Sequence, residues 1–231
     1  MQVYQIRIKL FMLKDIVVEQ IQEKLTLFFD MGFAVSEELL QMHKENRFKY
    51  YCYDFPYKPE QDKIYRKENI YTVTVRTIDP KLAEFFYQVC VHHYTEDFKA
   101  LVAEIHILPQ KRIECLYTLT PVILKDDQKG YWRSHMSLKD FEDRLKVNLI
   151  KKWKCFTGEA VDEDFQLYTL LEFLNHKPIR VHYKGISLLG DKIRLEIADN
   201  EMAQNLSYMA LGAGLLENNS RGSGFVNYRW L

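Results

Sequence analysis

The chain has 231 residues, of which 32 are Lys or Arg and 32 are Asp or Glu, so its formal net charge is zero. This length fits two compact domains, and the neutral charge argues against a protein that coats nucleic acid indiscriminately. The four cysteines lie far apart without a Cys-x-x-Cys pair, and no apolar run is long enough to span a bilayer. We therefore expect a reduced, cytoplasmic protein that does not enter a membrane.

The first half of the chain predicts the order strand, helix, strand, strand, helix, strand. Residues 4–10 alternate between apolar and polar side chains, which indicates a strand with one buried face, and apolar residues at helical spacing follow over residues 17–28. Asp79-Pro80 is a typical helix start. The other strands are expected over Phe48–Phe55, Tyr71–Ile78 and Leu101–Leu108. This order is the ferredoxin-like plan, so a first domain is predicted over residues 1–108.

The second half repeats this order with additions. A strand over Ile113–Leu124 bends at Thr120-Pro121, Ser137 caps a helix, and Asp162 begins another helix that runs through Phe173. A hairpin with its turn at Gly190-Asp191, a helix and a last strand complete the order, over Ile179–Leu188, Lys192–Ile197, Glu201–Leu211 and Phe225–Trp230. We expect an α+β protein of two tandem ferredoxin-like (RRM-like) domains with antiparallel sheets, the second domain spanning residues 109–231.

A glycine-rich loop joins the last helix to the last strand and contains four of the nine glycines. Glycine permits positive φ and close approach of a ligand to the backbone, which suits a phosphate chain. The spacing is neither a dinucleotide fingerprint nor a P-loop. A mobile surface loop is the alternative. The predicted nucleic-acid contacts of the loop are Gly212, Gly214, Asn218, Ser220, Arg221, Gly222 and Gly224.

His43 is the histidine best placed for catalysis. It follows a predicted helix and lies six residues before Lys49, which opens a strand. Such a histidine can act as general acid or base while the lysine neutralises developing phosphate charge. An ordinary surface histidine is the alternative. No histidine has a partner at metal-ligand spacing and no carboxylate cluster suits a two-metal nuclease, so no metal or cofactor is expected.

The segment Gly214–Phe225 resembles the glycine-rich motif of the CRISPR-associated repeat-processing endoribonucleases, the sixth Cas family, within the RAMP superfamily. The resemblance covers the whole chain, including the two ferredoxin-like units and the Thr120-Pro121 bend. It implies metal-independent cleavage of precursor CRISPR RNA within each repeat, giving mature guide RNAs. It also implies that His43 matches the catalytic histidine and Lys49 its supporting lysine.

The implied reaction is attack of a ribose 2′-hydroxyl on its own phosphodiester, leaving a 2′,3′-cyclic phosphate and a 5′-hydroxyl. His43 moves a proton, while Lys49 with loop amides or Arg221 stabilises the charge of the transition state. Basic residues beside Trp153 are expected to hold the RNA backbone, namely Lys151, Lys152 and Lys154. Some relatives add a catalytic tyrosine at the end of the first helix, where this chain has phenylalanines. A hydroxyl donor would come from Tyr50, Tyr51 or Tyr53.

Two alternatives to the endoribonuclease stay open at this point. The first is a RAMP-type subunit that holds guide RNA in an effector complex without cutting it, and it shares the fold and the loop. The second is a structural or small-molecule-binding protein with duplicated ferredoxin-like domains. The expected partner is the precursor CRISPR RNA repeat. Other Cas proteins of an effector complex, and a monomeric or homodimeric state, stay open as well.

Overall fold

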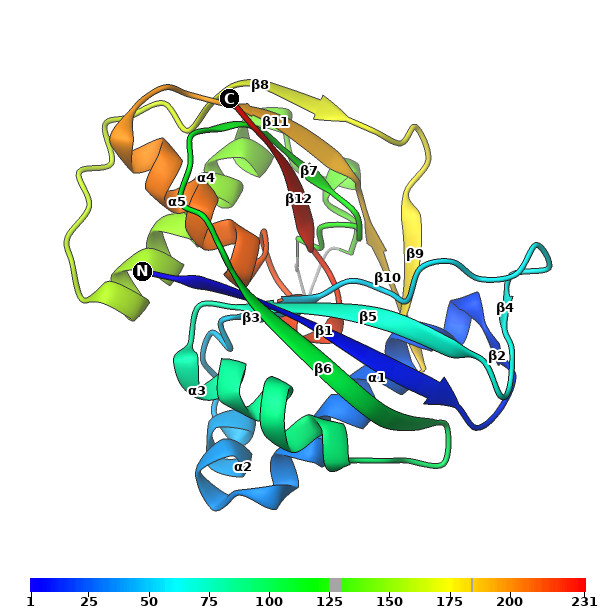
Figure 1. Ribbon diagram of the computed structural model, residues 1–231. Helices are drawn as coiled ribbons and strands as arrows, with labels where there is room; N and C mark the ends of the chain where they lie inside the picture. Colours follow the sequence, from blue (N-terminus) through cyan, green and yellow to red (C-terminus); the bar gives the residue numbers. More distant parts are fainter. Residues whose placement is uncertain (125–129, 184) are drawn as a thin grey trace.

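The computed structural model describes residues 1–124, 130–183 and 185–231, and consists of two four-stranded antiparallel sheets with helices packed against them (Figure 1). The predicted α+β fold of two ferredoxin-like units is therefore confirmed. The strand order is β3-β5-β1-β6 in one sheet and β12-β7-β11-β8 in the other. All strands of the first sheet precede those of the second in the sequence, and the division into domains at residue 108 stays a prediction.

The first sheet lies above helices α1, α2 and α3 in Figure 1. Its strands are β1 (Val3–Met12), β3 (Tyr51–Tyr53), β5 (Ile70–Thr77) and β6 (Phe98–Leu108). Its helices are α1 (Val18–Gly32), α2 (Glu37–Lys44) and α3 (Pro80–Glu84), with the short turns η1 (Phe33–Val35), η2 (Phe85–Val89) and η3 (Cys90–His92). A small ribbon of β2 (Ile16–Val17) and β4 (Ile64–Tyr65) extends from one end.

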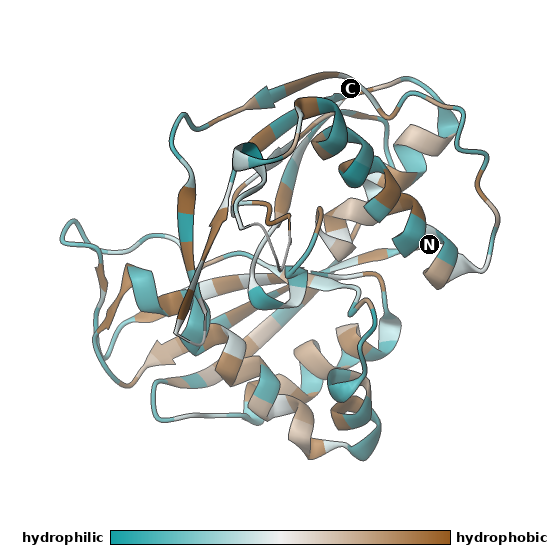
Figure 2. Cartoon of the chain, turned by 180° about the vertical axis from the view of Figure 1, so that it is seen from behind, coloured by the Kyte–Doolittle hydropathy of each residue, from teal (hydrophilic) through white to brown (hydrophobic). Residues whose placement is uncertain are grey.

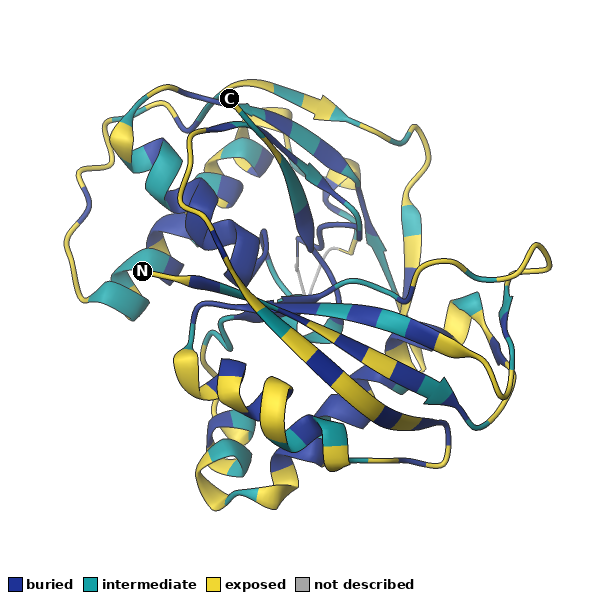
Figure 3. Cartoon of the chain, in the orientation of Figure 1, coloured by how far each residue is buried: buried dark blue, intermediate teal, exposed yellow. Residues whose placement is uncertain are grey.

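Alternation of side chains along β1 determines which face of the first sheet is buried. Ile6, Ile8 and Leu10 are fully buried, whereas Arg7 and Lys9 between them are exposed. The same alternation of buried and exposed residues is visible along the first sheet in Figure 3. Burying the apolar face under the helices is the main stabilising contribution, at roughly 1.5 to 3 kcal/mol for each large aliphatic side chain.

The second sheet has the same plan with one insertion. Its strands are β7 (Ile113–Thr118), β8 (Tyr168–Phe173), β11 (Ile193–Ile197) and β12 (Val226–Trp230), and its helices are α4 (Leu138–Thr157) and α5 (Glu201–Ala213), with η4 (Trp132–Ser134) and η5 (Asn219–Arg221). Ser137 caps α4 through a capping box with Asp140, as its sequence predicts. Figure 2 shows hydrophobic and hydrophilic residues alternating along the helices. In α4 the buried residues Phe141, Leu145 and Leu149 recur at helical spacing, whereas α5 is buried continuously over residues 206–213 and contacts strands of both sheets.

The predicted helix from Asp162 to Phe173 is wrong, because residues 168–173 form strand β8 and pair with β11. Leu171 and Phe173 pack on the core, while Glu172 between them is exposed and Leu170 before them is 55% exposed. This alternation has the period of a strand. An apolar run of this length satisfies helical and strand spacing about equally, so the pairing with β11 decides its conformation.

The predicted hairpin around Gly190-Asp191 is also wrong. Strand β9 (Ile179–Tyr183) pairs with β10 (Ile186–Gly190) in a separate ribbon, and β11 pairs with β7 and β8 instead. Gly190 is needed for a close approach rather than for a turn, because a Cβ there would lie 2.4 Å from the carbonyl oxygen of Val122. Asp191 is fully buried and accepts hydrogen bonds from side chains of Tyr131, Trp132, Arg133 and Asn175.

Two further predicted strands are shorter than expected. Of the stretch Phe48–Phe55, only β3 is a strand, and it begins after Tyr50, whose φ of 54° interrupts extended backbone. The stretch Ile113–Leu124 ends as a strand at Thr118, although Val122 and Ile123 beyond the bend form isolated bridges.

The two halves share a buried contact centred on Arg76 of β5. Its guanidinium donates to the carbonyl oxygen of Val226 at 2.6 Å and lies 4.6 Å above the ring of Phe225. It also donates to the side chain of Gln5 at 2.9 Å. Because a buried guanidinium needs its donors satisfied, these contacts fix the last strand against the first sheet.

Candidate functional site

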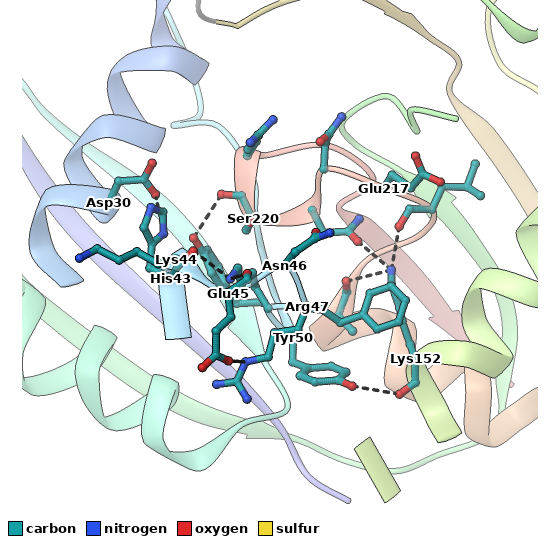
Figure 4. A pocket seen from close by; sticks show the side chains of 18 residues that line it. Asp30, His43, Lys44, Glu45, Asn46, Arg47, Tyr50, Lys152, Glu217 and Ser220 are labelled. Atoms are coloured by element: carbon teal, nitrogen blue, oxygen red, sulfur yellow. Dashed lines mark hydrogen bonds and ion pairs between the residues drawn. The ribbon is translucent and has the colours of Figure 1, made fainter. Parts of the chain in front are cut away.

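A cavity of about 460 Å³ lies where the end of α2 meets the glycine-rich loop (Figure 4). Residues 43–51 of the first half line one side of the cavity, and residues 216–221 of the loop line another. Asp30 from α1, Lys152 from α4 and Ala213 from α5 complete the lining. The cavity therefore combines residues from both ferredoxin-like units.

His43 lies in the last turn of α2, a helix that Ser36 caps at its start. The His43 ring stacks on the buried ring of Phe33 with 5.8 Å between centroids and 25° between planes. Its Nδ1 lies 3.5 Å from Oδ1 of Asp30, and about a third of the His43 side chain is exposed. The predicted catalytic histidine is thus held on two sides and accessible from the cavity.

Lys49 acts on the helix that carries His43. Its ammonium donates to the carbonyl oxygens of Met42, His43 and Glu45, the last two at 2.9 and 2.6 Å. These are carbonyls that the end of a helix leaves without an intrahelical donor. Burial lowers the pKa of Lys49, as does the nearby charge of Arg47. In this structure Lys49 stabilises the end of α2, and a contact with phosphate stays a prediction.

The glycines of the loop are buried, which differs from the open cradle expected of them. Gly222 has a φ of 79°, and a Cβ there would lie 2.8 Å from the ring of Tyr53. The amides of Gly222 and Gly224 donate to the carbonyl oxygens of Asn219 and Pro121. Gly212 and Gly214 are likewise buried. The glycines therefore allow the loop to pack closely, and its half-buried outer side is residues 217–221.

Hydrogen bonds hold this outer side against the first half. The hydroxyl of Tyr51 donates to the carbonyl oxygen of Ser220 at 3.2 Å, and the side-chain amide of Gln22 donates to that of Arg221 at 2.6 Å. Asn218, Ser220 and Arg221, all predicted RNA contacts, line the cavity. The loop thereby places these residues in the same cavity as His43.

Lys152 lies behind the loop and is only 2% exposed. Its ammonium donates to the carbonyl oxygens of Gly214 and Leu216 at 2.8 and 2.9 Å, and to the side-chain oxygen of Asn219 at 2.7 Å. An RNA backbone contact was predicted for Lys152, but burial and these acceptors leave it no exposed donor. Lys152 instead determines the path of the loop (Figure 4).

Burial lowers the pKa of Lys152 to about 7, and the nearby Cys52 and Glu217 offset this only in part. The neighbouring lysines on α4 are more exposed than Lys152. Lys151 is exposed, and Lys154 forms an ion pair with Glu163 at 2.9 Å. Of these three lysines, all of which the structure describes, only Lys152 lines the cavity.

Tyr50 and Tyr51 line the cavity, whereas the buried hydroxyl of Tyr53 lies 2.7 Å from that of Thr26. Burial raises the pKa of Tyr50 to about 12.

Asp30 and Arg47 line the cavity but were not identified from the sequence. A weak signal for Asp30 was available, because a short connection between two helices brings the end of the first near the second.

The family model described as "CRISPR associated protein Cas6, C-terminal" matches residues 103–228, which is more than half of the chain. The chain therefore belongs to the Cas6 family of CRISPR-associated proteins. This confirms the resemblance found in the sequence. Membership supports a role in processing or binding CRISPR RNA. No curated protein sequence matches the chain significantly.

Solved structures show the same fold. A RAMP protein described as binding different RNA substrates superposes with a TM-score of 0.74 at 16% identity, covering 98% of this chain and 99% of its own. A Cas6-related protein from Pyrococcus furiosus gives 0.71 at 19% identity, with 98% of both chains covered. A Cas6 in a product complex gives 0.65 at 17% identity, with 99% of both chains covered. At these identities the likeness establishes the fold alone.

Within residues 1–124, 130–183 and 185–231, no group of three or more His, Cys, Asp or Glu side chains could hold a metal ion. Across the same residues, no helix is long and apolar enough to cross a bilayer.

Replacing Lys152 with Met should change how stability depends on pH. Between pH 7 and 10.5 the unfolded chain retains a proton that the buried lysine has lost, so the free-energy cost of burying this group declines and the fold becomes more stable as pH rises. The unfolding free energy of the wild type, minus that of Lys152→Met, should therefore grow by about 2 kcal/mol between pH 7 and 9 in urea titrations. The exposed Lys151→Met is the control and should show no such trend. Equal trends in both variants would contradict a lowered pKa at Lys152.

Proposed function

We propose that this protein is a metal-independent endoribonuclease that cleaves precursor CRISPR RNA within its repeats to give mature guide RNAs. One observation carries the proposal: His43, from the first ferredoxin-like unit, lines the same cavity as the outer side of the glycine-rich loop from the second. A group that can transfer protons thus faces a segment suited to a phosphate backbone. Membership in the Cas6 family supports the RNA partner.

The proposed reaction is an internal transesterification. The 2′-hydroxyl of the nucleotide upstream of the cut attacks the adjacent phosphorus, and His43 takes up the proton that this hydroxyl loses. The bond to the 5′-oxygen of the next nucleotide breaks, and this oxygen takes a proton from solvent, which leaves a 2′,3′-cyclic phosphate and a 5′-hydroxyl; the protonated His43 returns its proton to solvent. Cationic side chains that line the cavity would stabilise the additional negative charge, and the candidates are Lys44, Arg47 and Arg221.

His43→Ala should slow cleavage of a cognate repeat RNA by roughly 10² to 10⁴, the usual contribution of a positioned acid or base. RNA affinity should change little, because one histidine adds little to a polyanion interface. Single-turnover rates and filter binding measure the two effects separately. His92→Ala, an exposed histidine outside the cavity, is the control. A wild-type rate in His43→Ala would remove His43 from the mechanism, and a wild type that binds without cutting would favour the non-catalytic RAMP subunit.

A single 2′-deoxy nucleotide immediately upstream of the cut should abolish cleavage and leave binding intact, because the attacking group is then missing. The products of unmodified RNA should carry a 2′,3′-cyclic phosphate, or its opened form, and a 5′-hydroxyl. EDTA should change neither the products nor the rate. A 5′-phosphate product, or inhibition by EDTA, would point to water activated by a metal ion and contradict the mechanism.

The salt dependence of RNA binding should separate residues that contact phosphate from those that hold the loop. Arg221→Ala should reduce the slope of log affinity against log salt by about 0.7, the value for one phosphate contact on a single strand. Lys152→Met should weaken binding with no change of slope, since its ammonium contacts the loop. An unchanged slope in Arg221→Ala, or a reduced slope in Lys152→Met, would contradict these assignments.

A further inference from the structure

Asp30 is the only acidic side chain that the structure pairs with His43 among the described residues. It lies near the end of α1 and points toward the histidine ring (Figure 4). Its Oδ1 is 3.5 Å from Nδ1 of His43, which is an ion-pair distance and slightly longer than a hydrogen bond. Catalytic hydrogen bonds are often long in free enzymes and shorten in the complex with substrate.

We propose that Asp30 is a positioning residue that orients His43 by accepting a hydrogen bond from its Nδ1–H. A neutral imidazole has one protonated nitrogen, and the partner of that nitrogen determines which tautomer forms. With the proton on Nδ1, the Nε2 lone pair is available to the cavity. Nε2 is then the atom that removes the proton from the 2′-hydroxyl, and this consequence rests on the proposed function.

The surroundings of His43 leave its ring few other orientations. Phe33 is fully buried and stacks on the His43 ring at 25°, which fixes the plane of the imidazole. Phe33 itself stacks on Phe85 with 4.7 Å between centroids, so it cannot shift freely. A 180° flip of the ring about its Cβ–Cγ bond would return it to the same plane with its two edges exchanged, and the Asp30 carboxylate distinguishes these two orientations.

The charge of Asp30 also suits the reaction. When Nε2 takes up a proton, the imidazole becomes a cation, and a carboxylate at Nδ1 stabilises that cation. About a quarter of the Asp30 side chain is exposed, so water screens part of this effect. Asp30 also acts on Lys49, where its negative charge opposes the lowering of that pKa by burial and by Arg47. Asp30 is thus linked to both residues predicted to be catalytic.

The first test needs no RNA. In ¹⁵N-labelled protein, the ring nitrogen shifts of neutral His43 report which nitrogen bears the proton. The wild type should show Nδ1 protonated. Asp30→Asn, which keeps the shape but can turn its NH₂ toward the ring, should move the population toward Nε2–H. Identical ring shifts in the wild type and in Asp30→Asn would overturn the proposal.

The second test measures catalysis. Asp30→Asn should lower the single-turnover rate about 10- to 100-fold, which is part of the roughly 10² to 10⁴ that a positioned base supplies. RNA affinity should stay within about twofold of the wild type, because the substitution neither adds nor removes a contact with phosphate. Glu38→Gln is the matched control, since Glu38 is an exposed carboxylate on α2 that pairs with Lys81 away from the cavity.

The outcomes distinguish this proposal from the proposed function. If His43→Ala cleaves normally, the proposed mechanism fails, while the ring shifts still decide whether Asp30 sets the tautomer. If His43→Ala is inactive and Asp30→Asn keeps both the wild-type rate and the wild-type shifts, the role of Asp30 is overturned. In the double variant, Asp30→Asn should cause no further loss once His43 is replaced, because it acts through the histidine.

Discussion

The candidate site depends on one buried contact, between the Lys152 ammonium and the oxygen atoms on the inner side of the glycine-rich loop. Where the chain turns after α5, its carbonyl groups point inward, away from water, and need donors there. While it is protonated, the Lys152 ammonium offers three donors, so a single side chain of α4 satisfies the carbonyl oxygens of Gly214 and Leu216 together with the side-chain oxygen of Asn219. The position of the outer side of the loop, and therefore the wall it forms beside His43, follows from this contact.

Elements with a strong local signal could be predicted from the sequence, and elements chosen by tertiary pairing could not. Alternation in β1 and the Ser137 cap of α4 are local properties, and both are observed. Strand β8 was predicted as a helix, because its apolar residues fit both periods and only pairing with β11 decides between them. The turn dipeptide Gly190-Asp191 was misleading for a similar reason: Gly190 is required by the approach of Val122, and Asp191 by the donors around it.

In the candidate site, too, some features could be predicted from the sequence and others depend on tertiary packing. The resemblance indicated His43 and the loop, and the fold places them in one cavity. Composition could not show whether a glycine makes room for a ligand or for the protein itself, and Gly222 makes room for Tyr53. Nor could it show that Lys152 is buried while Lys151 is exposed, since both belong to one basic run. Asp30 is thirteen positions from His43, and their contact depends on the turn η1 between two helices.

A neutral protein can still present a cationic cavity if its acids there already have partners. Among the residues that the structure describes, three acids line the cavity, and each is paired: Asp30 with His43, Glu45 with Arg47 at 2.9 Å, and Glu217 with Arg144 at 3.3 Å. The charges of Arg47 and Arg144 reduce the repulsion that Glu45 and Glu217 exert on a phosphate, because each of these two negative charges is partly offset at short range. Arg144 does not line the cavity, so its charge compensates Glu217 from outside. The local balance of charge at the site, rather than the net charge of the chain, therefore determines whether a polyanion can approach His43.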